Sequence, residues 1–153
     1  MTMPETTCQE AISIRFPALS FNQGWVHLVR DMDRLSRSSK KGFKRGLHKD
    51  LLVVDFNGNM FRIVDARKVR TLIDLNVNSL LGLLSGNPGL QLELSFASPS
   101  KINVEHLKKL ISDCFKRHEA FWEEMSDFED FRTKISAAVS VDEIFSVFKA
   151  FKM

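Results

Sequence analysis

The sequence predicts an α+β domain, in which an antiparallel sheet of about four strands fills the first two thirds of the chain and three helices fill the last third. Three observations lead to this prediction: two β-rich runs joined by Asn57-Gly58, a strictly alternating segment at 90–96, and apolar residues at helical spacing after residue 103. With 153 residues we expect a single domain over 1–153, whose residues 1–10 form a disordered or loosely packed tail.

The first elements follow from a change in apolar spacing. Residues 12–16 alternate Ile-Ser-Ile-Arg-Phe, which predicts the first strand. After Pro17 the spacing becomes three and four, which predicts one early helix, with Ser20 or Asn22 as its N-cap. Its apolar face would be formed by Trp25, Leu28, Val29, Met32 and Leu35.

The clearest local pattern is LLVVDF-NG-NMFRIVD, which predicts a β-hairpin. Asn and Gly both tolerate the positive φ of a type I′ turn, and such a two-residue turn sets the register. Val54 would then lie opposite Phe61. Leu52 would lie opposite Ile63 on the same, core-facing side.

The rest of the chain predicts one more strand and three helices. Residues 66–84 suit a strand or a short helix, residues 87–89 a turn, and the alternation over 90–96 a strand with one wet face. Asn103 is the expected cap of a long helix, and Ser126 with Glu129 and Ser140 with Glu143 fit capping boxes of two further helices. The apolar stripe of the long helix comprises Val104, Leu107, Leu110, Ile111, Cys114, Phe115, His118, Phe121 or Trp122, and Met125.

The cysteines and the hydropathy of the sequence indicate the cellular compartment. Cys8 and Cys114 show neither disulfide-framework nor metal-ligand spacing, which indicates a reducing compartment. The start MTMPETTCQE lacks a basic region followed by an apolar run, and no stretch has the ~20 apolar residues of a membrane span. We therefore expect a cytoplasmic protein without a membrane-spanning segment.

The sequence contains no pattern that predicts catalysis. Glycine-rich phosphate loops and the Gly-x-Ser-x-Gly elbow are missing, and no two of the four histidines stand at metal-ligand spacing from each other. His118 lies on an apolar stripe, so we expect a hydrogen-bonded core histidine. Asp55 and Asp65, on opposite arms of the hairpin, are expected on the solvated face. We predict a non-enzyme without metal or cofactor.

An acidic run from Glu119 to Asp130 is the stronger candidate for partner binding, because it contains six acids, with Trp122 and Phe128 interspersed, and no Lys or Arg. Acids beside an aromatic residue can steer and anchor a basic partner. The alternative is structural, with acids favouring a helix amino terminus and the tryptophan in the core. The candidate partner-binding residues are Glu119, Trp122, Glu123, Glu124, Asp127, Glu129 and Asp130.

A basic stretch from Arg34 to Lys49 is the alternative candidate, for phosphates of nucleic acid. It has no acid, and its Phe43 could stack on a base. The structural alternative is a solvated loop between helix and hairpin. The candidate phosphate-binding residues are Arg34, Arg37, Lys40, Lys41, Lys44, Arg45 and Lys49.

From Asp50 onward the chain resembles the small immunity proteins of bacterial toxin and immunity pairs, including those of contact-dependent growth inhibition. The resembling segments are DLLVVDFNGNMFRIVDARKV, LQLELSF and EHLKKLISDCFKRHEAFWEEMSDFEDFRTKISAAVSVDEIF, which lie within residues 50–145, a span of about two thirds of the chain. The resemblance implies a protein that binds one cognate toxin domain and occludes it. The net charge of +3 departs from the acidic character common among immunity proteins against nucleases. Either the toxin is not a nuclease, or the acidic run alone meets its basic cleft.

Overall fold

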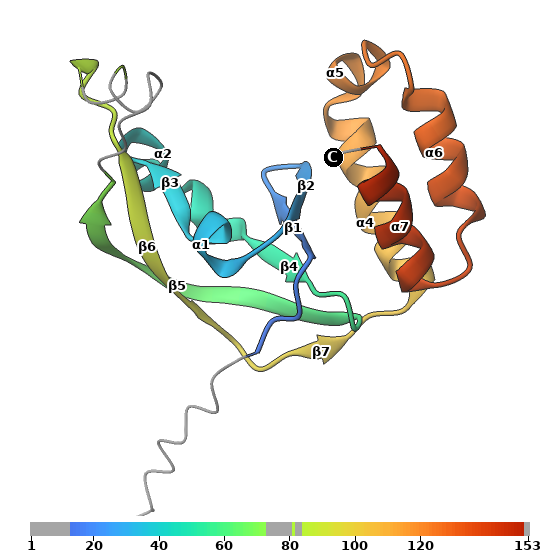
Figure 1. The fold of residues 1–153 in the computed structure, drawn as a ribbon, viewed down its shortest axis with the longest axis horizontal. Helices are drawn as coiled ribbons and strands as arrows, with labels where there is room; N and C mark the ends of the chain where they lie inside the picture. Colours follow the sequence, from blue (N-terminus) through green and yellow to red (C-terminus); the bar gives the residue numbers. More distant parts are fainter. Residues whose placement is uncertain (1–12, 73–80, 82–83, 152–153) are drawn as a thin grey trace, which may run out of the picture.

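The computed structural model describes residues 13–72, 81 and 84–151. In this part of the chain a curled antiparallel sheet lies beside a group of helices (Figure 1). The sheet has seven strands instead of about four, in the order β2-β1-β4-β5-β6-β3, with β7 paired to β5 off that path. The strands are β1 (Ala18–Asn22), β2 (Trp25–Val29), β3 (Arg37–Ser39), β4 (Leu52–Val54), β5 (Asn59–Thr71), β6 (Gly89–Phe96) and β7 (Ser100–Lys101).

The helices form two groups. Those of the last third gather on one side of the sheet, and the short early ones lie beside the β5–β6 ribbon, away from them (Figure 1). The early ones are α1 (Met32–Leu35), α2 (Lys40–Lys44) and the 3-10 helix η1 (Leu47–Asp50). The last third contains α4 (Val104–Arg117), α5 (Glu119–Glu123), α6 (Phe128–Ala137) and α7 (Val141–Ala150). Four helices replace the predicted three, because the long helix ends at His118, where φ is −124° and ψ is 43°.

Residues 25–35 do not form the predicted early helix. Instead β1 and β2 pair as a hairpin across Gln23 and Gly24, whose φ values of 54° and 78° fit a type I′ turn. The run WVHLV is aromatic and β-branched, and Val26 lies opposite Phe21 on the face covered by the helices. Tertiary pairing therefore overrides the helical spacing of the apolar residues.

Only one turn of helix forms within that segment, at α1. The carboxylate of Asp31 caps it by accepting a hydrogen bond from the N–H of Arg34, at 2.8 Å. Neither Ser20 nor Asn22 is a cap, since both lie in β1.

The predicted first strand is also displaced. The described residues of 12–16 have no strand geometry, and β1 begins at Ala18. Backbone groups of Arg15 bond to the β4–β5 connection, because its carbonyl accepts from the N–H of Phe56 (3.1 Å) and its N–H donates to Asp55 (3.2 Å). The buried Ile14 belongs to a smaller core cluster.

The predicted hairpin of β4 and β5 is present, but its register differs by one residue. Val53, and not Val54, lies opposite Phe61. The turn is not type I′, because Gly58 has a positive φ (76°) and Asn57 does not. Three residues, 56–58, connect the strands, as in hairpins that end with a left-handed glycine.

The carboxylate of Asp55 explains this register. It accepts hydrogen bonds from the N–H groups of Asn57 (3.0 Å) and Asn59 (2.9 Å), from the side-chain amide of Asn59 (3.3 Å) and from the N–H of Arg15 (3.2 Å). Asp55 is fully buried, so its expected place on the solvated face is wrong. Asp65 is exposed, as expected.

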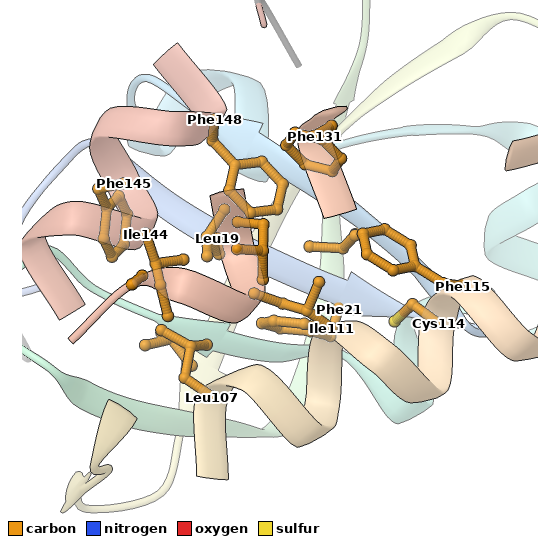
Figure 2. Close-up of a cluster of buried hydrophobic side chains, with 14 of the residues drawn as sticks. Leu19, Phe21, Leu107, Ile111, Cys114, Phe115, Phe131, Ile144, Phe145 and Phe148 are labelled. Carbon is orange, nitrogen blue, oxygen red and sulfur yellow. The ribbon is translucent and has the colours of Figure 1, made fainter. Parts of the chain in front are cut away.

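The main hydrophobic core fills the space between the sheet and α4, α6 and α7. Figure 2 shows Leu19 and Phe21 of β1 facing side chains of the helices, among them Ile111, Phe131 and Phe148. A second cluster lies apart from the first and contains Ile14, Ala18, Leu51, Val53 and Phe61. Strands of the sheet therefore contribute apolar side chains to both clusters.

The predicted helix N-caps and strand bounds agree with the structure only in part. Asn103 caps α4 through the N–H of His106 (2.8 Å), and Ser140 caps α7. No side chain caps α6, so the predicted box of Ser126 and Glu129 does not form. The strand at 90–96 is confirmed, and β5 runs to Thr71, whereas 73–80 and 82–83 lie outside the described residues. No described helix is both long and apolar enough to cross a membrane.

Candidate protein-binding surface

The junction of α4 and α5 is fixed to the β1–β2 turn by His118. Its Nε2 lies 2.9 Å from the carbonyl oxygen of Gln23, and a carbonyl only accepts, so Nε2 carries the proton. The imidazole also stacks on the indole of Trp25, with 3.8 Å between ring centroids. The expected hydrogen bond is present, but His118 is half-buried at the edge of the core and not within it.

An open apolar hollow of about 520 Å³ lies between β2 and α5. Its buried wall is formed by Val26 and Trp122, whereas the side chain of Phe121 is 51% exposed. The rings of Trp25 and Phe121 meet edge to face at 4.8 Å. The six lining residues are Trp25, Val26, His27, Phe121, Trp122 and Met125.

Trp122 is part of the core and does not project as an anchor. It is 2% exposed and packs edge to face against Phe115 at 5.0 Å. Its indole N–H is buried and has no acceptor among the described residues. Phe128, a second aromatic residue of the acidic run, is buried too. The exposed aromatic residue is Phe121, which the helical stripe left as an alternative to Trp122.

The acids of the run are all exposed, but they differ in their ion pairs. Glu129 binds Arg132 at 2.7 Å and Asp130 binds Lys134 at 3.3 Å. The remaining four form no ion pair with any described residue: Glu119, Glu123, Glu124 and Asp127. The structure therefore places three free carboxylates, at 119, 123 and 124, on the same short helix and cap as Phe121.

His27 adds no positive charge to this surface. Burial lowers the pKa of its imidazole below the ordinary value of 6.5, because desolvation disfavours the charged form. The lowered pKa favours the neutral form of this ring near pH 7.

The basic stretch is folded and is not the solvated loop that the structural alternative expected. It spans α1, β3, α2 and η1, and β3 pairs with β6. Arg34 and Arg37 are engaged by Asp31 (3.9 Å) and Asp33 (2.7 Å). Five basic residues form no ion pair within the described part of the chain: Lys40, Lys41, Lys44, Arg45 and Lys49.

Phe43 is not free to stack on a base. It is half-buried and packs on the imidazole of His48, with 5.1 Å between centroids. The structure thus retains the cationic part of the predicted nucleic-acid site, while one face of its aromatic ring is already occupied by His48.

No family model matches the chain, and no curated protein or solved structure is significantly similar to it. The resemblance to immunity proteins stays a prediction, and the function must be argued from the surface.

Proposed function

We propose that this chain is a cytoplasmic immunity protein, which binds a cognate toxin domain stoichiometrically and occludes it without catalysing a reaction. The observation that carries the proposal is the open aromatic hollow between β2 and α5, beside carboxylates that form no ion pair with described residues. Aromatic side chains at the centre of an interface supply much of the binding energy, and complementary charge sets the association rate.

The distribution of charge favours this surface. The net charge is +3, but residues 1–70 carry 13 basic and 7 acidic side chains, and residues 71–153 carry 9 and 12. α5 and α2 lie in opposite halves of the molecule (Figure 1). A basic toxin surface would therefore meet locally negative charge at the hollow in spite of the positive net charge.

The test begins with the gene directly upstream, which the proposal expects to encode a large secreted protein that ends in a toxin domain. This toxin domain is co-expressed with the chain, and growth and complex formation are measured. We expect rescue of growth and a one-to-one complex. A chain that neither rescues growth nor forms the complex would contradict the proposal.

Variants locate the surface. Phe121→Ala should weaken the complex by about 2 kcal/mol or more, as expected for a central aromatic anchor. Charge removal at Glu119, Glu123 and Glu124, each to Gln, should slow association and reduce its dependence on salt. Asp142→Asn is the matched control, since it removes an exposed acid on α7. Equal effects of the control and the triple variant would exclude a steering role for α5.

The second candidate is a nucleic-acid-binding protein, favoured by the five basic residues of α2, η1 and their flanks that form no ion pair with described residues. Binding through about five phosphates would give a log–log salt slope of roughly −4 to −5. A gel-shift series in rising salt measures this slope. Absence of a shifted band at low salt would eliminate this candidate.

A further inference from the structure

Resting on the proposed function, we propose that the hollow between β2 and α5 receives an arginine side chain of the partner. The aliphatic stem would lie on the apolar lining, and the guanidinium would lie against the exposed aromatic ring and the carboxylates of α5. Three properties of the described residues lead to this assignment: the chemistry of the walls, the local charge, and the absence of an internal cation paired with those carboxylates.

The walls favour an occupant with an apolar stem and a planar head. Trp25, Phe121, Trp122 and Met125 present mainly carbon to the hollow, and Phe121 exposes about half of its side chain. Aromatic faces attract guanidinium groups through the ring quadrupole. A polar uncharged occupant would lose hydration without such compensation.

The charge beside the hollow favours a cation. Glu124 lies three residues after Phe121, on the same face of α5, and Glu119 and Glu123 lie on the same short helix. The neutral His27 does not offset their charge. A phosphate or carboxylate occupant would face repulsion, whereas a cation would be attracted.

The chain does not supply this cation itself. Arg117, the last residue of α4, has its stem against the β1–β2 turn, where its Cδ lies 2.3 Å from the position that a Cβ on Gly24 would take. It forms no ion pair with any described carboxylate. The acids of α5 are therefore available to a partner.

Arginine fits these features better than lysine. Its guanidinium is planar, weakly hydrated and able to stack on a ring while it donates two parallel hydrogen bonds to a carboxylate. The ammonium of lysine is strongly hydrated and lacks the planar fork, so it would lose more on entering an apolar hollow.

The test uses the full chain and small probes, and it does not require the toxin. N-acetyl-arginine amide is titrated into ¹⁵N-labelled protein, and the indole N–H signals are followed; the two tryptophans give two such signals. The matched probes are the lysine, citrulline and norleucine derivatives. Citrulline keeps the shape of arginine without the charge, and norleucine keeps an apolar stem.

We expect saturable shifts of the Trp25 indole signal with the arginine probe, at an affinity at least about fivefold higher than with citrulline or norleucine. The affinity of the lysine probe should lie between that of the arginine probe and those of the citrulline and norleucine probes. Equal or tighter binding of norleucine would overturn the proposal in favour of an apolar anchor. Absence of a saturable shift with arginine would overturn it as well.

Variants make the assignment specific. Phe121→Ala and Glu124→Gln should each weaken arginine binding severalfold, and Asp142→Asn should leave it unchanged. Unchanged arginine binding in both α5 variants would place the probe elsewhere and overturn the assignment. Arginine binding without growth rescue would contradict only the proposed function, and growth rescue without preference for arginine would contradict only the anchor.

Discussion

Trp25 and His118 stack almost parallel, with ring centroids 3.8 Å apart and 11° between their planes, and this contact joins the edge strand β2 to the start of α5. The same imidazole donates a hydrogen bond to the carbonyl of Gln23 in the β1–β2 turn. Since Phe121 follows His118 by three residues, the position of the exposed ring depends on this pair.

The first prediction concerns the stability of that junction. His118→Ala removes both the stacking and the hydrogen bond, and should lower the free energy of unfolding by about 2 kcal/mol. His118→Phe retains an aromatic ring on Trp25 and should cost about 1 kcal/mol. Urea unfolding followed by circular dichroism measures both. His106→Ala, at an exposed histidine of α4, is the control, and a His118→Ala variant as stable as this control would contradict the prediction.

The second prediction concerns the buried carboxylate of Asp55. Asp55→Asn keeps the shape of the side chain but replaces an accepting oxygen by an amide that faces N–H donors. We expect a loss of about 2 to 4 kcal/mol in unfolding free energy, because buried donors are left without an acceptor. Asp65→Asn, on the exposed part of β5, should change stability by less than about 0.5 kcal/mol. Equal losses in the two variants would show that the hydrogen bonds of Asp55 add nothing.

Strong local patterns predicted part of the fold. The helix after Asn103, the strand at 90–96 and the pairing of β4 with β5 were readable because apolar periodicity and caps agree there. The predicted early helix was wrong, since the aromatic and β-branched run from Trp25 to Val29 also suits a strand, and its pairing with β1 decides the outcome. The one-residue register error at Val54 arose because the Asp55 carboxylate selects a longer turn than Asn57-Gly58 alone would favour.

The candidate site was predicted as an acidic segment and not as a hollow. A run of carboxylates is visible in any sequence, but which aromatic residue of the run is exposed depends on where α4 ends. The long helix was expected to continue through Met125, and the break at His118 arises from contacts with the distant Gln23 and Trp25. Such long-range contacts leave no local pattern in the sequence.

The third prediction separates the two adjacent aromatic residues of α5. Trp122→Ala should lower the free energy of unfolding by about 3 to 5 kcal/mol, because it opens a cavity in the main core. Phe121→Ala should lower it by less than about 1 kcal/mol, since half of that side chain is already exposed. Thermal and urea unfolding test this contrast. A Phe121→Ala variant as unstable as Trp122→Ala would place Phe121 in the core.

The fourth prediction is a pH dependence that originates at Cys114. Burial, with a smaller contribution from the Asp113 carboxylate, raises the pKa of this thiol from 9.0 to about 11. Below pH 9 the thiol is protonated in both the folded and the unfolded chain, so it adds no pH dependence. Between pH 9 and about 11 the unfolded chain loses the proton first, so stability falls as pH rises, by an amount on the order of 2 kcal/mol.

Two variants isolate this thiol. Cys8→Ser leaves Cys114 as the only cysteine, and Cys8→Ser with Cys114→Ala provides the reference. The difference in unfolding free energy between them should be flat up to pH 9 and should shrink above it. In the folded Cys8→Ser protein, alkylation at pH 8 should be slow and should accelerate in urea. Rapid alkylation without urea would show that the thiol is accessible.

The fifth prediction tests how Gly24 and Arg117 share space at the β1–β2 turn. Gly24 has a φ of 78°, and a Cβ there would lie 2.3 Å from Cδ of Arg117, so Gly24→Ala suffers both backbone strain and a steric clash. We expect a loss of about 2 kcal/mol in unfolding free energy. In an Arg117→Ala background the clash is absent and only the strain of the left-handed backbone remains, on the order of 1 kcal/mol. A double-mutant cycle by urea unfolding measures the difference, which should be positive and about 1 kcal/mol. Additive effects of the two substitutions would mean that the Arg117 stem moves aside without loss, and that only the backbone conformation requires glycine at this turn.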